Sequence, residues 1–278
     1  MTKKINILYE DANILAIDKP AGISVHPSNF LRASVEGKDK EKFITDWILK
    51  NYPKMENVGE PSVYEGKVIK RPGIVHRLDK DTSGVLLLAK NQKAYEFLKS
   101  QFKNREIKKI YHCLVSGFVK EDRGTVNKPI GRSPNDFRKH LAGRGARGEL
   151  REAITEYKVI KRLTLPLAPS LIKEGEASPD NGELVNSELG RRLEGFNEAK
   201  FTYLELTPKT GRTHQIRVHM KFLNHPVVCD SLYNPGKPAL LGIDRLALHA
   251  KSIEFKDLKG KTVKVESPLP KEFLEVTK

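Results

Sequence analysis

Cysteine is rare in this chain, and no long apolar segment occurs in it. Only Cys113 and Cys229 are present among 278 residues, and they form no spaced framework. Because both lie in otherwise apolar segments, we expect buried, reduced thiols rather than a disulfide or a metal site. No apolar run approaches the roughly 20 residues that span a bilayer, and residues 1–5 lack the apolar core of a signal peptide. The sequence therefore predicts a cytoplasmic protein without a membrane partner.

The signatures of several enzyme classes are also missing. Glycine-rich phosphate loops are absent, so no nucleotide cofactor is indicated. Ser83 lacks the G-x-S-x-G turn of a hydrolase nucleophile. His214 and His219 are five residues apart, which does not place them on one helical face as a zinc pair would be. We therefore expect neither a cofactor nor a metal.

Positive charge is what the chain has in excess. Its 50 Lys and Arg residues outnumber its 35 Asp and Glu residues, which gives a formal net charge of +15. Such an excess on a folded chain indicates a polyanionic partner. Apolar residues make up 38%, which suffices for a core. Since no repeat and no Pro/Ser linker divides the chain, we expect residues 1–278 to form one domain.

The segment 76–84, His-Arg-Leu-Asp-Lys-Asp-Thr-Ser-Gly, precedes the apolar run 85–89. An apolar run of this length after a glycine predicts a buried strand. Asp79 would then lie on a turn braced by the core. Taken alone, Asp79 is better explained as a turn or cap residue than as a catalytic group.

Hydrophobic periodicity places the other elements. An N-terminal hairpin is expected over 7–20, with its turn at 11–13. Helices are predicted at 92–103, capped by Asn91, and at 213–223. The remaining predicted strands cover residues 110–115, 153–160, 201–206, 246–250 and 252–255.

Two segments interrupt this pattern. Residues 30–70 are polar and irregular apart from a helical pattern between Lys42 and Tyr52, which predicts a surface excursion with one short helix. Residues 163–200 are rich in proline, glycine and acids, which predicts a disordered insertion between two paired strands. A third stretch, 138–148, alternates bases with glycines and is either a solvated loop or a loop that contacts phosphates.

These motifs together resemble the RluA-type family of RNA pseudouridine synthases. The match to the family's catalytic motif H-R-L-D-x-x-T-S-G is complete, and other matches follow in the family's order. The matching segments are 9–27, 76–84, 109–111, 211–219 and 245–250. The resemblance thus covers most of the chain outside 30–70 and 163–200. Since the first motif begins by Ile7, we expect the N-terminal S4 RNA-binding domain of many relatives to be missing.

The resemblance implies an α+β fold with a central mixed, mostly antiparallel sheet, flanking helices and a basic active-site cleft. It assigns Asp79 as the catalytic carboxylate, Tyr111 as the ring stacked on the target base, and Arg217 as the ion-pair partner of Asp79. A hydrogen-bonded arginine would favour the charged form of such a carboxylate. Without the resemblance, Arg217 would be taken for a solvated helix residue and Tyr111 for a core tyrosine.

The same resemblance implies an RNA-binding surface. The target uridine has to leave its stack, which costs a few kcal/mol and requires groups that hold the flipped base. We expect Arg77 near the RNA, Leu248 against the base, and Arg212 and His214 as phosphate or pocket contacts that could also brace the helix. Lys109, in the K-x-Y motif, is assigned to RNA binding with them.

The predicted function is the isomerisation of uridines in structured RNA, ribosomal or transfer, by a protein expected to be a monomer. Asp79 could attack C6 or C1′ of the nucleotide, or remove the 2′ proton, and the sequence leaves these routes open. A non-catalytic RNA-binding protein of the same fold is the alternative from another class. A metal-dependent hydrolase of nucleic acids is a third possibility.

Overall fold

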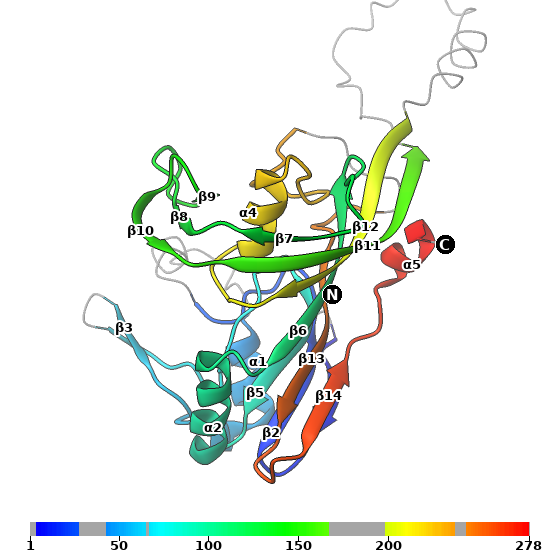
Figure 1. Ribbon diagram of the computed structural model, residues 1–278. Coiled ribbons are helices and arrows are strands. Elements are labelled where there is room, and N and C mark those ends of the chain that lie inside the picture. Colours follow the sequence, from blue (N-terminus) through cyan, green and yellow to red (C-terminus); the bar gives the residue numbers. More distant parts are fainter. Residues whose placement is uncertain (1–3, 28–42, 65–66, 167–197, 237–242, 278) are drawn as a thin grey trace, which may run out of the picture.

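The computed structural model describes residues 4–27, 43–64, 67–166, 198–236 and 243–277 (Figure 1). Within these residues, nine strands form one large sheet. In spatial order the strands are β1 (Asn6–Glu10), β2 (Ile14–Lys19), β5 (Ser83–Ala89), β13 (Leu248–Lys256), β6 (Lys108–Ser116), β12 (Glu198–Pro208), β11 (Ile154–Pro166) and β7 (Arg123–Asn127), with β14 (Thr262–Glu266) beside β13.

The sheet is mixed and mostly antiparallel, as predicted. Among the described strands only β5 and β13 run parallel, and they pair at His249 with Ser83 and at Ala250 with Gly84. The predicted hairpin is β1 and β2, whose turn is closed by the Asp11 carboxylate, which accepts the backbone N–H groups of Asn13 and Ile14. The β5 strand is buried along its whole length, which confirms the prediction for residues 85–89.

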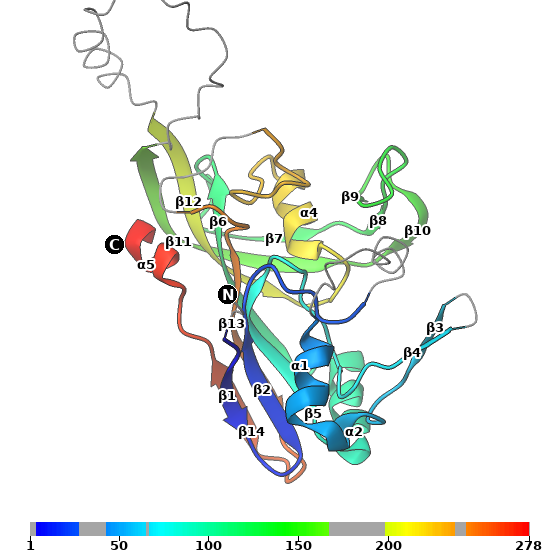
Figure 2. The ribbon, with the colours of Figure 1, turned by 180° about the vertical axis from the view of Figure 1, so that it is seen from behind.

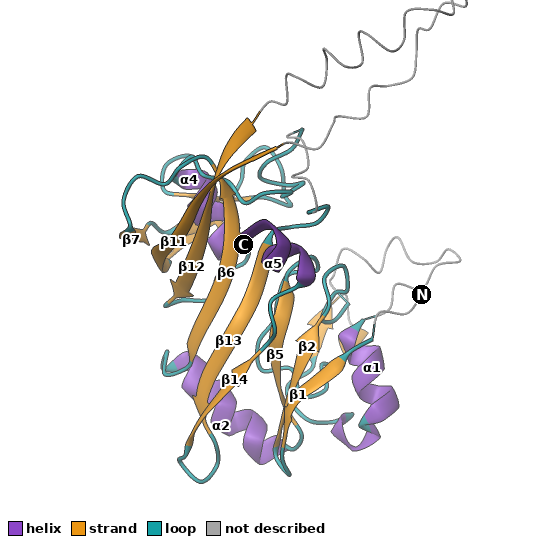
Figure 3. Ribbon diagram, turned by 90° about the vertical axis from the view of Figure 1, so that its right-hand side faces the viewer, coloured by secondary structure: helices purple, strands orange, loops and turns teal. Residues whose placement is uncertain are grey.

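Most of the described helices lie on one face of the sheet. The helices α1 (Ile44–Asn51), α2 (Gln92–Lys103) and α4 (Gln215–Phe222) lie on one face, and the short α5 (Lys271–Thr277) lies on the other (Figures 1 and 3). A 3-10 turn, Pro53–Met55, follows α1. In the described part of the chain, no helix is long and apolar enough to cross a membrane.

The α2 helix begins where the sequence predicts, because the Asn91 side chain accepts the Ala94 backbone N–H at 3.0 Å. Apolar spacing predicts an inner face of Ala94, Phe97, Leu98 and Phe102. In the structure Ala94 and Leu98 are buried together with Tyr95 and Gln101, whereas Phe97 and Phe102 are only half-buried. Gln101 can be buried because its amide pairs with the backbone N–H and carbonyl of Lys256.

The segment predicted as a surface excursion contributes to the core. Ile44 and Ile48 of α1 are 0% exposed, so this helix packs against the sheet rather than lying apart from it. Two short antiparallel strands, β3 (Ser62–Tyr64) and β4 (Lys67–Ile69), form a pair that was not predicted, here called the β3/β4 hairpin. Residues 28–42 lie outside the described part.

The basic stretch 138–148 is not a simple loop. It contributes to a small sheet of β8 (Ile130–Arg132), β9 (His140–Ala142) and β10 (Arg147–Arg151), which we call the basic hairpin sheet. Its apolar side is anchored because Ile130 and Ala142 pack with the buried Ala153. The basic hairpin sheet and the β3/β4 hairpin project from the same side of the molecule, as seen from the front and from behind (Figures 1 and 2).

The predicted insertion at 163–200 overlaps strand residues at both ends. The β11 and β12 strands stay paired as far as Pro166 and Glu198. Leu163 and Phe201 are partners in this register and are 8% and 5% exposed, so burial of apolar side chains extends the ladder. Residues 167–197, and with them the predicted disorder, lie outside the described part of the chain.

Two hydrophobic clusters lie along the sheet. One joins β2, β5, α1, α2 and the far end of β13, and the other joins β6, β12, α4 and the start of β13. Tyr111 packs against both clusters and therefore marks the seam between them. Cys113 is a buried thiol in the second cluster, whereas Cys229 is only half-buried and its thiol donates to the carbonyl oxygen of Ile243; no disulfide joins these two described residues.

Gly84 is required by the approach of β5 to β13. Its φ is +109°, and a Cβ at this position would come within 2.2 Å of the Ala250 carbonyl oxygen. Any other residue would have to push the two parallel strands apart and adopt a strained backbone. The glycine that ends the 76–84 motif is therefore explained by packing.

We expect Gly84→Ala to lower the free energy of unfolding by more than about 2 kcal/mol, since it adds overpacking to backbone strain. Gly260→Ala is the matched control, because Gly260 also has a positive φ of +79° but has open space around it. Its cost should be about 1 kcal/mol. Urea unfolding of both variants measures the difference, and equal losses would contradict the packing argument.

Candidate active site

Asp79 lies on the turn that leads into β5. The turn is closed by a hydrogen bond from the Thr82 backbone N–H to the Asp79 carbonyl at 3.2 Å, and Leu78 anchors it in the core with 4% exposure. The side chain of Asp79 is 20% exposed. A carboxylate therefore projects into accessible space from a backbone that is firmly held.

Lys19, at the end of β2, binds the backbone of this turn. It is 0% exposed, and its ammonium donates to the backbone carbonyls of Pro20, Ile23 and Lys80 at 2.8–2.9 Å. The Gly22 backbone N–H also donates to the Lys80 carbonyl. Three carbonyl acceptors compensate the burial of the charge. The first hairpin and the turn of Asp79 are thus fastened together.

Arg217 of α4 contacts Asp79, but its main partner is Asp230. The Arg217 Nη1 lies 3.3 Å from Asp79 Oδ2, whereas Nε and Nη2 donate to the two Asp230 oxygens at 2.7 and 2.8 Å. Burial opposes the charge of Arg217, but the hydrogen bonds to Asp230 and the charge of Asp79 outweigh it and raise the pKa of the guanidinium. One permanent cation therefore bridges two carboxylates.

Arg217 does not lie on a solvated helix face. It is 7% exposed, and α4 is buried almost all round because its polar side chains bond to the neighbouring backbone. Gln215 donates to the Ile154 carbonyl and to the Thr155 hydroxyl, at 3.0 and 2.9 Å. His219 lies within hydrogen-bond distance of the same hydroxyl. These bonds explain why polar residues of this helix lie inside the protein, where apolar periodicity alone would not place them.

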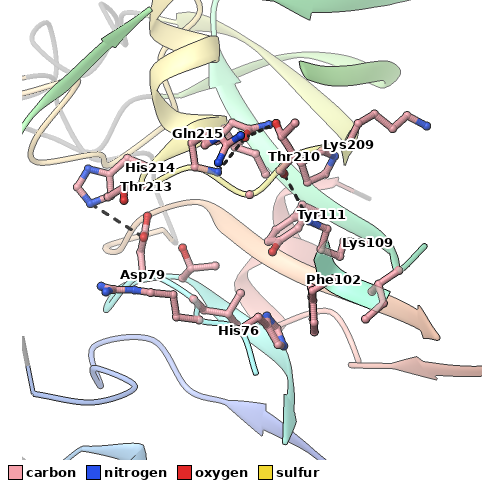
Figure 4. Close-up of a pocket in the computed structure, with 18 of the residues that line it drawn as sticks. His76, Asp79, Phe102, Lys109, Tyr111, Lys209, Thr210, Thr213, His214 and Gln215 are labelled. Atoms are coloured by element: carbon pink, nitrogen blue, oxygen red, sulfur yellow. Dashed lines mark hydrogen bonds and ion pairs between the residues drawn. The ribbon is translucent and has the colours of Figure 1, made fainter. Parts of the chain in front are cut away.

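His214 precedes α4 in a left-handed backbone conformation, with φ of 55°. Its Nε2 lies 4.0 Å from Asp79 Oδ1 (Figure 4). Arg217 and His214 therefore approach the same carboxylate. Burial lowers the pKa of His214 more than the charge of Asp79 raises it. A neutral imidazole therefore faces the carboxylate.

Tyr111 and Lys109 come from alternate positions of β6 and enter the same space (Figure 4). Burial, and after it the charge of Asp79, raises the pKa of Tyr111, so that its hydroxyl stays protonated at any physiological pH. Burial lowers the pKa of Lys109 to about 8, and its ammonium donates to the Thr210 carbonyl at 3.4 Å. The strand thus presents a neutral aromatic ring and a cation of reduced basicity.

His76 closes the lower side of this space. Its ring stacks on Phe102, with the ring centres 4.8 Å apart, and its Nε2 accepts the Leu87 backbone N–H at 2.9 Å. Burial, and then the charge of Lys109, lowers the pKa of His76 to about 3. His76 is therefore a neutral part of the wall, and its acceptor role explains why the motif begins with histidine.

A single pocket of about 550 Å³ is lined by all eight residues that the sequence singles out. This size is usual for a small-molecule site, roughly 300–1,000 Å³. Arg77 is exposed at its rim, and Leu248 is 3% exposed in its wall. The Arg212 Nε donates to the Glu152 carbonyl at 2.9 Å, so this residue also braces the structure. In the described part of the chain, no three His, Cys, Asp or Glu side chains are grouped as metal ligands would be.

Three residues of the site were not found from the sequence. Lys19 and Asp230 are buried charges, and the Tyr233 hydroxyl lies 3.0 Å from His214 Nδ1. Asp230 directly follows the apolar segment 227–229, but aspartate is mostly exposed in proteins, so this position alone does not indicate a buried carboxylate. Tyr233 carries no signal in the sequence either.

Comparison with known proteins identifies the family of this chain. A family model described as RNA pseudouridylate synthase matches residues 13–222. The chain belongs to the RNA pseudouridylate synthase family. It is 31% identical to an uncharacterised RNA pseudouridine synthase of Synechocystis sp., over 97% of this chain and 67% of the relative. Membership of this family, together with the names of the relatives, identifies this protein as an isomerase.

Other relatives of this pseudouridine synthase carry related names. Uncharacterised RNA pseudouridine synthase YlyB of Bacillus subtilis is 32% identical, over 98% of this chain and 71% of its own length. Ribosomal large subunit pseudouridine synthase D of Borreliella burgdorferi is also 32% identical, over 97% and 67%. Among solved structures, human RNA pseudouridylate synthase domain containing 1 shares the fold, with a TM-score of 0.64, 22% identity and coverage of 96% and 84% of the two chains.

The buried Lys109 should cost this pseudouridine synthase stability. Its pKa in the native state, about 8, lies below the ordinary 10.5, so between these pH values the unfolded chain binds more protons and stability rises with pH. We expect Lys109→Met to raise the free energy of unfolding by about 1–3 kcal/mol at pH 7. This gain should shrink as the pH rises above 8.

Urea unfolding at pH 7 and at pH 9.5 measures the effect. Lys108→Met is the matched control, because Lys108 is the exposed neighbour on the same strand. A variant at Lys109 that is less stable than the parent at pH 7 would show that the buried ammonium stabilises the fold.

Proposed function

We propose that this chain converts uridine to pseudouridine in a structured RNA, with Asp79 as the catalytic carboxylate. The observation that carries the proposal is the contact of Asp79 with a guanidinium that is already fixed by Asp230. Because two of its nitrogens are bound to Asp230, Arg217 presents its third to Asp79 in one orientation. A preorganised cation of this kind stabilises a carboxylate without further rearrangement.

The surroundings of Asp79 suit a flipped nucleotide. Tyr111 offers a neutral aromatic face at the seam between the two clusters, and stacking on such a face is the usual way an unstacked base is held. Leu248 supplies an apolar wall of the same pocket. Arg77 at the rim and Lys109 inside provide positive charge for the RNA backbone. The pocket thus combines a place for a base with contacts for a phosphate.

The reaction breaks the N1–C1′ bond, joins C5 to C1′, removes the hydrogen from C5 and leaves one on N1. It needs no redox partner, since the product is an isomer of the substrate. Attack by Asp79 on C6, attack on C1′ and removal of the 2′ proton all use an ionised carboxylate in a closed pocket. The rival function, RNA binding without catalysis, does not require Asp79, Tyr111 and Arg217 to meet in one cavity.

Among structured RNAs, ribosomal RNA of the large subunit is the substrate we favour. The support is the name of relatives such as ribosomal large subunit pseudouridine synthase D of Borreliella burgdorferi. Transfer RNA was the other expectation from the sequence. The basic hairpin sheet, which projects on the same side as the β3/β4 hairpin, offers a second positive surface for a folded RNA.

We expect Asp79→Asn to lower turnover by at least about 1,000-fold, because the amide is neither a nucleophile nor a base. Folding should be preserved within about 1 kcal/mol, and RNA should still bind. Asp81→Asn is the matched control, since Asp81 is exposed in the same turn. Release of tritium from RNA labelled at uridine C5 measures turnover. Measurable release by purified Asp79→Asn would show that Asp79 is not the catalytic carboxylate.

The substrate is tested with transcripts of large-subunit ribosomal RNA fragments and of transfer RNAs, presented to the purified protein separately. We expect pseudouridine in a defined ribosomal fragment and none in the transfer RNAs. A pseudouridine map of total RNA from cells with and without the gene should lose the same ribosomal position. Loss of a transfer RNA position instead would identify transfer RNA as the substrate.

A further inference from the structure

A line of hydrogen-bonding groups connects the basic hairpin sheet to Asp79. It begins at the backbone N–H of His140, the first residue of β9, which donates to the Tyr233 hydroxyl oxygen at 2.9 Å. That hydroxyl lies 3.0 Å from His214 Nδ1. On the other side of the same ring, Nε2 lies 4.0 Å from Asp79 Oδ1. Tyr233 and His140 are not needed for the function proposed above, so their arrangement calls for its own explanation.

The directions of these hydrogen bonds follow from the ends of the line. A carboxylate only accepts, so an Nε2 that carries a proton turns a positive N–H toward Asp79, whereas a bare Nε2 would turn a lone pair toward negative charge. The neutral ring has one proton, so Nδ1 is then the acceptor. Tyr233 must donate its hydroxyl proton to Nδ1, and its oxygen remains available to the His140 N–H. The two hydrogen bonds of the line then both run toward His214, and the Nε2–H of His214 faces Asp79 across 4.0 Å, an electrostatic contact longer than a hydrogen bond.

The neutral state of His214 depends on the groups that face it. Burial is the largest influence and lowers its pKa; the carboxylates of Asp79 and Asp230 raise it, and Arg217 and His140 lower it. Arg217 already neutralises part of the negative charge near the ring. A second proton on His214 would therefore gain little electrostatic stabilisation. A neutral histidine has two tautomers, and the bond made by one nitrogen decides which one is present.

Tyr233 is itself held in one position. It is 5% exposed, the Arg217 guanidinium lies 5.1 Å from the centre of its ring, and its backbone N–H donates to Asp230 Oδ1 at 3.0 Å. Asp230 therefore orients both the cation and the tyrosine. The hydroxyl oxygen cannot move away from His214 without breaking contacts that also hold Arg217.

We infer that Tyr233 is a positioning residue that fixes His214 in the tautomer whose Nε2–H faces Asp79. The inference rests on the proposed role of Asp79 as the catalytic carboxylate. In this arrangement the Nε2–H of His214 is the second positive group beside Arg217 that faces the carboxylate, and it acts through electrostatic attraction across 4.0 Å. Since the line begins on the basic hairpin sheet, the position of that sheet contributes to the orientation of the ring.

The tautomer is measured directly, without any substrate. The protein labelled with 15N in its eight histidines gives long-range proton–nitrogen correlations that distinguish a protonated Nε2 from a protonated Nδ1. The His214→Asn variant assigns the signals by their loss, and asparagine tolerates the left-handed backbone at this position. We expect a protonated Nε2 in the parent protein and a mixture of tautomers in Tyr233→Phe.

The consequence for turnover is measured with the same variant. Tyr233→Phe should lower kcat by about 3-fold to 10-fold, the value of one hydrogen bond, with the KM for RNA nearly unchanged. Tyr9→Phe is the matched control, since it removes a hydroxyl that is bonded to Asp11, within the turn between β1 and β2. The control should leave kcat and the histidine signals unchanged.

Two results would overturn the inference: a protonated Nδ1 on His214 in the parent protein, or a Tyr233→Phe variant whose His214 signals and kcat match those of the parent. Both are distinct from failure of the proposed function. That failure would appear as turnover by Asp79→Asn and would leave the histidine spectrum as expected.

Discussion

The buried guanidinium of Arg217 is the interaction on which the site depends. A charge that is 7% exposed persists in a protein only if it is paired and hydrogen-bonded. Asp230 meets that requirement through two bonds, and Asp79 receives the remaining donor. Arg217 thus ties α4 and the segment at 230 to the turn before β5. Removing Asp230 would leave the cation under-compensated, whereas without the charge of Asp79 the two bonds to Asp230 would remain.

This ion pair lies where the two hydrophobic clusters meet. The turn of Asp79 belongs to the first cluster through Leu78 and the buried β5 strand, and α4 belongs to the second through Ile216 and Met220. Tyr111 contacts both. A cleft at such a seam can contain polar groups without interrupting either core. Two contacts hold the turn of Asp79 in place on its side of the cleft. One is the close parallel pairing of β5 with β13 at Gly84, and the other is the set of hydrogen bonds from the Lys19 ammonium.

Polar side chains account for most differences between expectation and structure. Gln215 and His219 lie inward on α4 because they bond to the backbone and side chains of β11, and Gln101 does the same for the end of β13. An expectation based on apolar periodicity places such residues at the surface. Without the family resemblance, the same expectation would place Arg217 on a solvated face, although its partner Asp230 lies 13 residues further along the chain. Asp230 was overlooked because nothing near it in sequence indicates a cation.

The sequence by itself determined the buried strand after Gly84 through a short hydrophobic pattern, and the family through its ordered motifs. The resemblance to that family then implied the mixed sheet and the eight residues that line the pocket. Only the tertiary structure decided which charges share a partner. It showed that Asp230 holds Arg217, that Lys19 fastens the turn of Asp79 and that Tyr233 reaches His214. Hydrogen bonds between residues far apart in the chain form after the strands and helices have packed, so their partners leave no pattern in the sequence.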